Sequence, residues 1–411
     1  MKFLSSLKWN NQVVITKDLI YLLLIGGLYS LSVSLSNTFV NVFLWRQTND
    51  FFLIGLYNLT IVIIQPITFI FAGRLAKQID RIIVFRIGVV LLALYYVSVL
   101  LSGEKAADYL LLLGALLGMG YGFYWLAYNV LTFEITEPEN RDFFNGFQGV
   151  LGSIGGMSGP LIAGFMISKF IGFVGYTIIF GMSLALFAIA SVLTFFMKRR
   201  PAEGRFSFIK IVKERKQNRD WKMITNANLF QGIREGIFAF VINIYVYITT
   251  SSEMALGTFA FLNSFISFIT YFFAGKYIKP KHRYRSIFIG GILLFAATFT
   301  IVINTTYTSF LIYSATIAFA YPLVLVPFMS ISYDVIGRGW KAREMRIEYI
   351  VVRELYLNIG RTISILIFLF VITQFSLEKS ITYLLICLGS GYTWICWFVR
   401  KLKPEEIKGG D

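Results

Sequence analysis

The chain has 411 residues, of which 57% are hydrophobic and only 15% are charged. A soluble domain carries about a quarter charged residues and close to half apolar ones, so this composition excludes a water-soluble globular protein. The formal net charge of +16 would suit a nucleic-acid-binding protein, but the positions of the basic residues, described below, exclude that class as well.

Apolar runs recur along the chain, and each has the length of about 20 residues that is needed to cross the hydrocarbon core of a bilayer. Because lipid cannot satisfy free backbone groups, each run is predicted to be a helix. We therefore predict an all-α membrane protein with about twelve transmembrane helices. The predicted spans are 19–45, 52–73, 82–103, 107–132, 144–168, 172–197, 223–250, 255–275, 286–304, 308–330, 347–374 and 380–399.

The basic residues are distributed unevenly between the two sides that these spans define. Of the 38 lysines and arginines, three lie inside spans, four lie on one side and all the others lie on the second side. The four are Arg46, Lys105, Lys169 and Lys379. This asymmetry follows the positive-inside rule and predicts a multi-pass protein of the cell membrane with both termini in the cytoplasm. The basic charge then contacts anionic lipid headgroups, and no nucleic-acid partner is expected.

The longest connector, 198–222, divides the chain into two similar parts. We predict an N-terminal six-helix bundle at 1–197 and a C-terminal six-helix bundle at 223–411. Apolar and basic residues alternate within the connector, which is typical of an amphipathic helix at the membrane surface. A solvated basic linker is the alternative interpretation.

A basic loop occurs twice, after the second and the eighth span. Gly73, Lys77 and Arg81 in the first copy correspond to Gly275, Lys279 and Arg283 in the second, always with a separation of 202 residues. The repeat predicts two parallel halves that move against each other around a central substrate path. The glycines are expected to permit a tight exit from each helix.

The first loop and the fifth span resemble motifs of the major facilitator superfamily. The family's loop reads Gly-x-Leu-Ala-Asp-Arg-x-Gly-Arg. This chain matches its first Gly, Leu, Ala and final Arg, but it has Lys77 in place of the Asp and Asp80 in place of the second Gly. The family's span-five motif, Gly-x-x-x-Gly-Pro-x-x-Gly-Gly, is similar to Gly155-Gly156-Met157-Ser158-Gly159-Pro160-Leu161-Ile162-Ala163-Gly164 and differs only at Ala163.

The resemblance implies two six-helix bundles, secondary transport by alternating access, and a substrate cavity lined by spans one, four, seven and ten. Within the family the span-five motif is associated with antiporters and exporters. The resemblance also extends to a group of uncharacterised transporters of Gram-positive bacteria.

In the family, the acid of the loop motif pairs with basic residues near span eleven and stabilises one access state. Since Lys77 inverts that charge, we predict a latch of reversed polarity, with topology-setting charge alone as the alternative. The predicted pairs are Lys77 or Arg81 with Glu344 or Glu348, and Lys279 or Arg283 with Glu134 or Asp142.

Ionisable residues inside spans are costly and usually mark a pathway or a proton relay. Glu235 lies about twelve residues, or roughly 18 Å, along span seven, near the midplane where transporters bind substrate. We predict that Glu235 beside Arg234, or Glu354 facing Arg361, exchanges a proton. A fixed ion pair is the alternative, and Arg234 with Arg361 could instead bind an anionic substrate.

Polar and aromatic residues at helical spacing in spans one, four, seven and eleven define the predicted cavity. Its candidates are Asn37, Asn41, Tyr121, Trp125, Tyr128, Asn228, Gln231, Arg234, Asn358 and Arg361. The span-five residues Gly155, Gly159, Pro160 and Gly164 are expected to pack closely at the interface between the halves.

We therefore expect a monomeric, proton-coupled exporter of a small or amphipathic molecule. It would use no cofactor beyond the proton gradient and no metal, and it would not be an enzyme. Its expected partners are that substrate, whose identity the sequence leaves open, and membrane lipids. The alternatives are a flippase or exporter of lipid-linked molecules and a non-transporting scaffold or sensor.

Overall fold

A computed structural model describes residues 16–135, 138–199, 205–278, 280–375 and 377–402, and every regular element in this part of the chain is helical. The long helices are α2 (Lys17–Thr48), α3 (Phe51–Gln78), α4 (Arg81–Ser102), α5 (Leu110–Ile135), α6 (Pro138–Lys169), α7 (Val174–Phe195), α9 (Arg219–Phe238), α11 (Glu253–Tyr277), α12 (Arg283–Ile303), α13 (Tyr307–Gly337) and α14 (Arg346–Gln374). The shorter ones are η1 (Gly103–Tyr109), α8 (Phe208–Glu214), α10 (Val241–Thr250), η2 (Pro280–His282), α15 (Leu377–Gly389) and α16 (Gly391–Arg400).

These helices make twelve crossings. Eleven stretches within the described residues are long and apolar enough to span a membrane, and one of them, Arg81–Thr132, runs for 52 residues. That stretch contains α4 and α5, which η1 connects and which pack against each other. Because a single crossing needs about 20 residues, it accounts for two crossings. The predicted all-α fold with twelve transmembrane helices is confirmed.

The seventh and twelfth crossings are interrupted, where the sequence predicted continuous spans at 223–250 and 380–399. The seventh consists of α9 and α10, which meet at Ala239 and Phe240. The twelfth consists of α15 and α16, and Ser390 separates them between Gly389 and Gly391. Interrupted helices in transporters commonly lie beside the substrate site.

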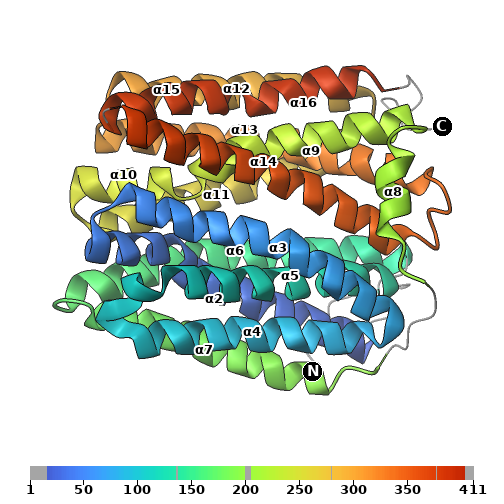
Figure 1. Cartoon of the computed structure of the whole chain (residues 1–411), viewed down its shortest axis with the longest axis horizontal. Helices are drawn as coiled ribbons and strands as arrows, with labels where there is room; N and C mark the ends of the chain where they lie inside the picture. Colours follow the sequence, from blue (N-terminus) through green and yellow to red (C-terminus); the bar gives the residue numbers. More distant parts are fainter. Residues whose placement is uncertain (1–15, 136–137, 200–204, 279, 376, 403–411) are drawn as a thin grey trace.

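Figure 1 shows two layers of nearly parallel helices, with α2 to α7 in the lower layer and α9 to α16 in the upper one. Helix α6 packs against α11, and α3 packs against α14, so these two pairs join the layers. Helix α8 runs across the ends of the upper-layer helices α9 and α14. The boundaries of the two bundles, 1–197 and 223–411, stay a prediction.

The half-length repeat is visible in the backbone. Asn49 and Ser251, 202 residues apart, both end a helix in the left-handed region, with φ of 48° in each case. The following residues, Asp50 and Ser252, both cap the next helix with their side chains. The two copies of the sequence therefore form the same turn between the first and second helix of each half.

The basic loop differs from its prediction. Helix α3 continues to Gln78 and α11 to Tyr277, so Gly73 and Gly275 lie inside helices and not at their exits. A Cβ on Gly73 would lie 2.9 Å from the Phe206 ring and 3.2 Å from a Val351 methyl carbon. Gly73 therefore permits the connector and α14 to approach α3.

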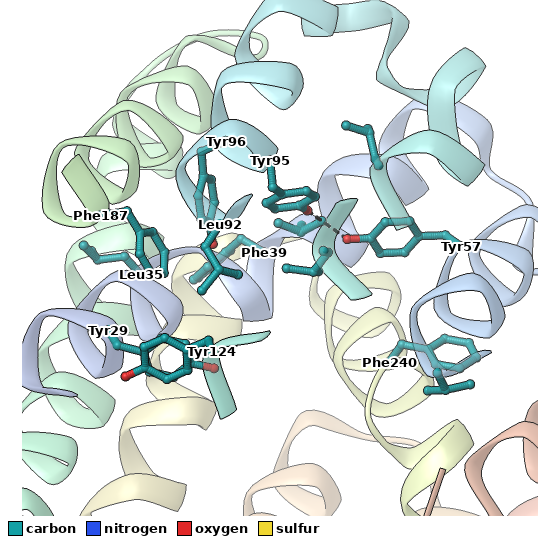
Figure 2. Packing of buried hydrophobic residues seen from close by; sticks show 14 of the residues in the cluster. Tyr29, Leu35, Phe39, Tyr57, Leu92, Tyr95, Tyr96, Tyr124, Phe187 and Phe240 are labelled. Atoms are coloured by element: carbon teal, nitrogen blue, oxygen red, sulfur yellow. Dashed lines mark hydrogen bonds between the residues drawn. The ribbon is translucent and has the colours of Figure 1, made fainter. Parts of the chain in front are cut away.

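Aromatic residues dominate the core of the first layer. The rings of Tyr29 and Tyr124 stack with centroids 4.0 Å apart, and the Tyr57 and Tyr95 hydroxyls form a 2.8 Å hydrogen bond (Figure 2). All four side chains are buried. The hydroxyls of Tyr29, Tyr57 and Tyr95 find partners within the protein, as buried phenols generally do.

The connector docks onto the second layer through α8. Ile211 is fully buried, and its carbonyl accepts a 3.1 Å hydrogen bond from the Trp221 indole. The Glu214 carboxylate accepts a 3.0 Å bond from the backbone N–H of Trp340. These contacts attach the short helix to the C-terminal helices, while Ile209 on its other side is exposed.

Candidate functional site

A cavity of about 930 Å³ lies between the two layers. Side chains from α2, α3, α5 and α6 in one layer and from α9 to α14 and α16 in the other line it. Nine of the predicted cavity and proton-site residues contribute to its wall: Asn37, Asn41, Tyr121, Trp125, Gln231, Arg234, Glu235, Glu354 and Arg361. Its volume lies in the range of about 300–1,000 Å³ that is typical of small-molecule sites.

Three predicted cavity residues lie in the helix packing instead. Tyr128 stacks on Tyr124, with ring centroids 5.6 Å apart. Asn228 donates to the Ile224 carbonyl over 2.8 Å, and Asn358 donates to the Glu354 carbonyl over 2.9 Å. The helical spacing that suggested them covers an arc wide enough to include packed neighbours of the true lining.

The first layer contributes amides and aromatic rings. Asn58 donates to Asn41 over 2.8 Å, and the Trp125 indole donates to the Tyr29 hydroxyl over 3.0 Å. Asn58 and Gln65 line the cavity although the sequence analysis missed them. Their spacing of seven residues in α3 places both on one face and could have revealed them.

Glu235 is the most extensively bonded charged group in the cavity wall. Its Oε1 accepts hydrogen bonds from Gln231 Nε2 at 2.8 Å and from the Tyr392 hydroxyl at 2.9 Å. Its Oε2 accepts from Arg361, at 2.6 Å from Nη2 and at 3.2 Å from Nε. The carboxylate therefore connects three helices, α9, α14 and α16.

Glycines explain why Arg361 reaches Glu235. A Cβ on Gly232 would lie 1.9 Å from the Leu357 carbonyl oxygen, and one on Gly360 would lie 2.0 Å from the Leu229 carbonyl oxygen. Only glycine at both positions permits this backbone contact between α9 and α14. Gly232 lies one helical turn before Glu235 in α9, and Gly360 directly precedes Arg361 in α14. The crossing of the two helices therefore places the two charges side by side.

The ion pairs in the cavity differ from the predicted ones. Glu354 forms its ion pair with its neighbour Arg353, with Nη2 and Oε1 2.8 Å apart, where Arg361 was the predicted partner. Arg361 pairs with Glu235, at 2.6 Å, where Arg234 was the predicted neighbour. Helical spacing alone could not decide these partners because they depend on which helix packs against which.

At the end of the bundle where α3 ends and α14 begins, here termed the basic end, Lys77 meets Glu348. Lys77 Nζ lies 2.5 Å from Glu348 Oε1 and donates to the Glu344 carbonyl over 2.9 Å. The same Glu348 oxygen accepts a 3.2 Å bond from the backbone of Ser207 in the connector. This is one of the predicted latch contacts, and it joins the two layers; its action as a latch stays a prediction.

The other predicted latch contacts are wrong or fall outside the described residues. Arg81 pairs with Glu134 at 2.8 Å, and Arg283 pairs with Asp334 at 2.7 Å. Both pairs join neighbouring helices of one layer, α4 to α5 and α12 to α13. The Glu344 side chain is exposed and pairs with Lys341. Lys279 and the side chain of Asp142 lie outside the described residues.

Asp80 has a structural role that its departure from the family motif did not suggest. Its carboxylate accepts a 2.6 Å hydrogen bond from the Ile82 backbone and caps α4. Such caps satisfy backbone donors at a helix start that have no partner within the helix.

At the opposite end of the bundle, Arg46 in the last turn of α2 pairs with Glu253 in the first turn of α11, at 2.8 Å. The Tyr176 hydroxyl donates to the same carboxylate over 3.1 Å. In the sequence Arg46 was only a topology signal, and this pair was not predicted. It also joins the two layers, so the described residues contain one interlayer ion pair at each end.

The span-five glycines of α6 contact two different partners. Cβ atoms on Gly155 and Gly159 would meet the α2 backbone, at 3.1 Å from Leu31 N and 2.8 Å from the Ser34 carbonyl carbon. One on Gly164 would lie 2.7 Å from the Glu253 carbonyl oxygen on α11. Pro160 lines the cavity, and its carbonyl approaches α11 at Gly257. Contrary to expectation, Gly155 and Gly159 therefore pack within one layer, and Gly164 with Pro160 packs between layers.

Twelve crossings in two layers, a cavity between them that contains charged and amide side chains, and an ion pair across each end are the features of a membrane transporter. The comparisons specify the class: residues 22–347 match the Major Facilitator Superfamily. The chain belongs to this superfamily and is a secondary transporter, not an enzyme.

Two bacterial relatives are similar over long stretches. The chain is 54% identical over 397 residues to the "Uncharacterized protein YqgE" of Bacillus subtilis, covering 97% of this chain and 92% of that protein. It is 63% identical over 180 residues to the "Uncharacterized protein in sodM 3'region" of Geobacillus stearothermophilus, covering 44% of this chain and 83% of that protein.

Solved structures support the fold alone. An auto-inhibited POT family peptide transporter aligns with a TM-score of 0.74 and 10% identity over 94% of this chain and 98% of its own. The human organic anion transporter MFSD10 aligns with a TM-score of 0.67 and 14% identity, over 94% of this chain and 99% of its own.

Proposed function

We propose that this secondary transporter is a proton-coupled exporter of the cell membrane in which Glu235 is the main proton site. The observation that carries the proposal is the position of Glu235 in the cavity wall, bonded to side chains of three helices. A carboxylate that depends on three helices responds to any movement among them. Glu354, which also lines the cavity, is the second candidate.

The proton affinity of such a carboxylate depends on its surroundings. A nearby cation favours the ionised form, and burial in apolar surroundings favours the neutral form. If movement of α14 or α16 relative to α9 during the transport cycle separates Arg361 from Glu235, the carboxylate loses its compensating charge and takes up a proton. The other ionisable groups near it are Arg234 on α9, Tyr271 on α11, Tyr321 on α13 and Tyr392 on α16.

The two interlayer ion pairs provide the corresponding gates. Lys77 with Glu348 closes the basic end, and Arg46 with Glu253 closes the opposite end. Alternating access requires that one gate open while the other remains closed. The positive-inside rule supports a cytoplasmic position for the basic end and for both termini.

The export direction is supported by the span-five motif in α6. In the superfamily this motif accompanies antiporters and exporters, and here Pro160 with Gly164 forms close contacts with α11. Close packing of α6 against α11 would limit proton leakage between the layers during exchange.

Interspin distances between the layers would test the proposal without a known substrate. Cys387 and Cys396 are replaced by serine, and spin labels are placed at exposed Arg74 and Arg343 for the basic end. Exposed Lys105 and Thr305 report on the opposite end. In proteoliposomes we expect the two distances to change with pH in opposite directions.

Glu235→Gln should abolish most of this pH response while the protein stays folded. A non-transporting scaffold would give distances that do not depend on pH in the unmodified chain, and that result would refute the proposal. The flippase alternative predicts the same distance changes only when lipid-linked molecules are added.

A further inference from the structure

Arg234 is a buried cation at the cavity whose charge is not compensated. Its side chain belongs to α9 and lines the cavity, yet the residue is only 6% exposed. Its Nε and Nη2 atoms are buried and have no hydrogen-bond partner among the described residues. The hydroxyl of Tyr313, which carries no charge, is its polar neighbour.

The charges of the cavity wall do not balance. Its described lining contains three arginines and two glutamates. Arg353 pairs with Glu354, and Arg361 pairs with Glu235. Arg234 has no carboxylate within ion-pair distance in the part of the chain that the structure describes, so one positive charge remains. Burying an unpaired charge is costly, and an anion in the cavity would remove that cost.

Two aromatic rings hold the Arg234 guanidinium in place. Its central carbon lies 4.5 Å from the centroid of Phe238 and 4.9 Å from that of Tyr392. Gly391 permits α16 to approach, since a Cβ there would lie 3.0 Å from the Cβ of Arg234. Aromatic contacts to the guanidinium face leave its edge donors for an acceptor. A planar fork of donors suits the two oxygens of a carboxylate or phosphate group.

The opposite wall of the cavity suits an apolar body. Tyr121 and Trp125 of α5 line it from the first layer, whereas Arg234 belongs to the second. We infer that Arg234 binds the carboxylate or phosphate-type group of an organic anion whose apolar part lies against the α5 aromatics. The inference rests on the proposed transport function, because it identifies the class of substrate that the cavity accepts.

Thermal unfolding of the purified full-length protein would test the inference with a matched set of probes. The set comprises 1-naphthylacetate, 1-naphthylmethylphosphonate, the neutral 1-naphthylacetamide and the cationic 2-(1-naphthyl)ethylamine, with inorganic phosphate as the oxyanion alone. We expect the two organic anions to raise the unfolding temperature in a saturable way. The amide, the amine and inorganic phosphate should leave it unchanged.

Three variants identify the residue responsible. Arg234→Gln should abolish the shift, and Arg234→Lys should weaken anion binding at least tenfold because the fork is lost. Arg86→Gln is the matched control, since Arg86 donates to the Thr194 carbonyl and lies outside the cavity lining. It should retain the shift. Without ligand, Arg234→Met should unfold at the same temperature as the unmodified protein or higher, because it removes an uncompensated charge.

Several results would overturn the inference. These are equal stabilisation by acid and amide, an anion response that survives in Arg234→Gln, and no response to either organic anion. An equal shift with inorganic phosphate would overturn the organic part, and a strongly destabilised Arg234→Met would indicate a structural arginine. None of these results depends on pH-driven distance changes, so anion binding and proton coupling can fail separately.

Discussion

Lys77 at the end of α3 and Glu348 at the start of α14 form a 2.5 Å ion pair in which the side chains are 7% and 0% exposed. The helix dipoles favour this arrangement, because a cation suits the last turn and an anion suits the first. Two helix ends from different layers are thereby joined at the basic end of the bundle.

Reversing one charge of this pair should disrupt it, and reversing both should restore it. Lys77→Glu leaves two buried carboxylates together and should destabilise the closed basic end by about 3–5 kcal/mol. We expect a longer Arg74–Arg343 interspin distance in this variant and a return towards the original value in Lys77→Glu/Glu348→Lys. If the double variant shows no recovery, the pairing has no role in the closed state.

The exposed pair Lys341–Glu344 is the matched control for that experiment. Its side chains are 51% and 65% exposed, and surface pairs of this kind contribute roughly 0–1 kcal/mol. Lys341→Glu should therefore leave the interspin distance at the basic end within error of the original.

Removing the ion pair at the other end should have the opposite effect. Arg46→Gln breaks the contact with Glu253. The Arg46 side chain is 29% exposed and the Glu253 side chain is 10% exposed. Since the pair is partly solvated, we expect a loss of only about 1 kcal/mol. The Lys105–Thr305 distance should lengthen, and the distance at the basic end should shorten. A change of both distances in the same direction would contradict alternating access.

The Glu235–Arg361 pair should show strong coupling in a double-mutant cycle. Arg361→Gln alone leaves a poorly compensated carboxylate and should lower the free energy of unfolding by about 3–5 kcal/mol. Glu235→Gln/Arg361→Gln should be less destabilised than this single variant, because both members of the pair are then neutral. Chemical unfolding in detergent measures both effects, and simple additivity would show that the two residues act independently.

The crossing of α9 and α14 should not tolerate any side chain at Gly232. Gly232→Ala places a Cβ where the Leu357 carbonyl oxygen would be 1.9 Å away, and overpacking of this kind costs about 1–3 kcal/mol or more. We expect a clearly lower unfolding temperature and a weaker pH response, since the crossing positions Arg361 against Glu235.

Gly181 in α7 provides the control for that substitution, because a Cβ there would have no neighbour within 4 Å. Gly181→Ala should stabilise the protein by about 0.5–1 kcal/mol through helix propensity. If both alanine variants unfold at the same temperature, the close approach at Gly232 is not required.

Sequence alone was sufficient for the twelve crossings, the two-half repeat and nine residues of the cavity wall. Hydrocarbon excludes water from every span, so length and hydrophobicity determine where helices form. The repeat of Gly73 at Gly275 could be read directly, and polar stripes such as Gln231 with Glu235 marked faces that cannot contact lipid. One observed contact, Lys77 with Glu348, was among the alternatives that charge and topology suggested for the latch.

Only the tertiary structure decided which charges are partners. Arg361 pairs with Glu235 because glycines let α9 and α14 touch, and Arg353 takes Glu354 from its own helix. Arg234 is consequently left with an uncompensated charge. A helical period tells which face a residue occupies, but partners are set by where helices cross, and that depends on packing between segments more than one hundred residues apart.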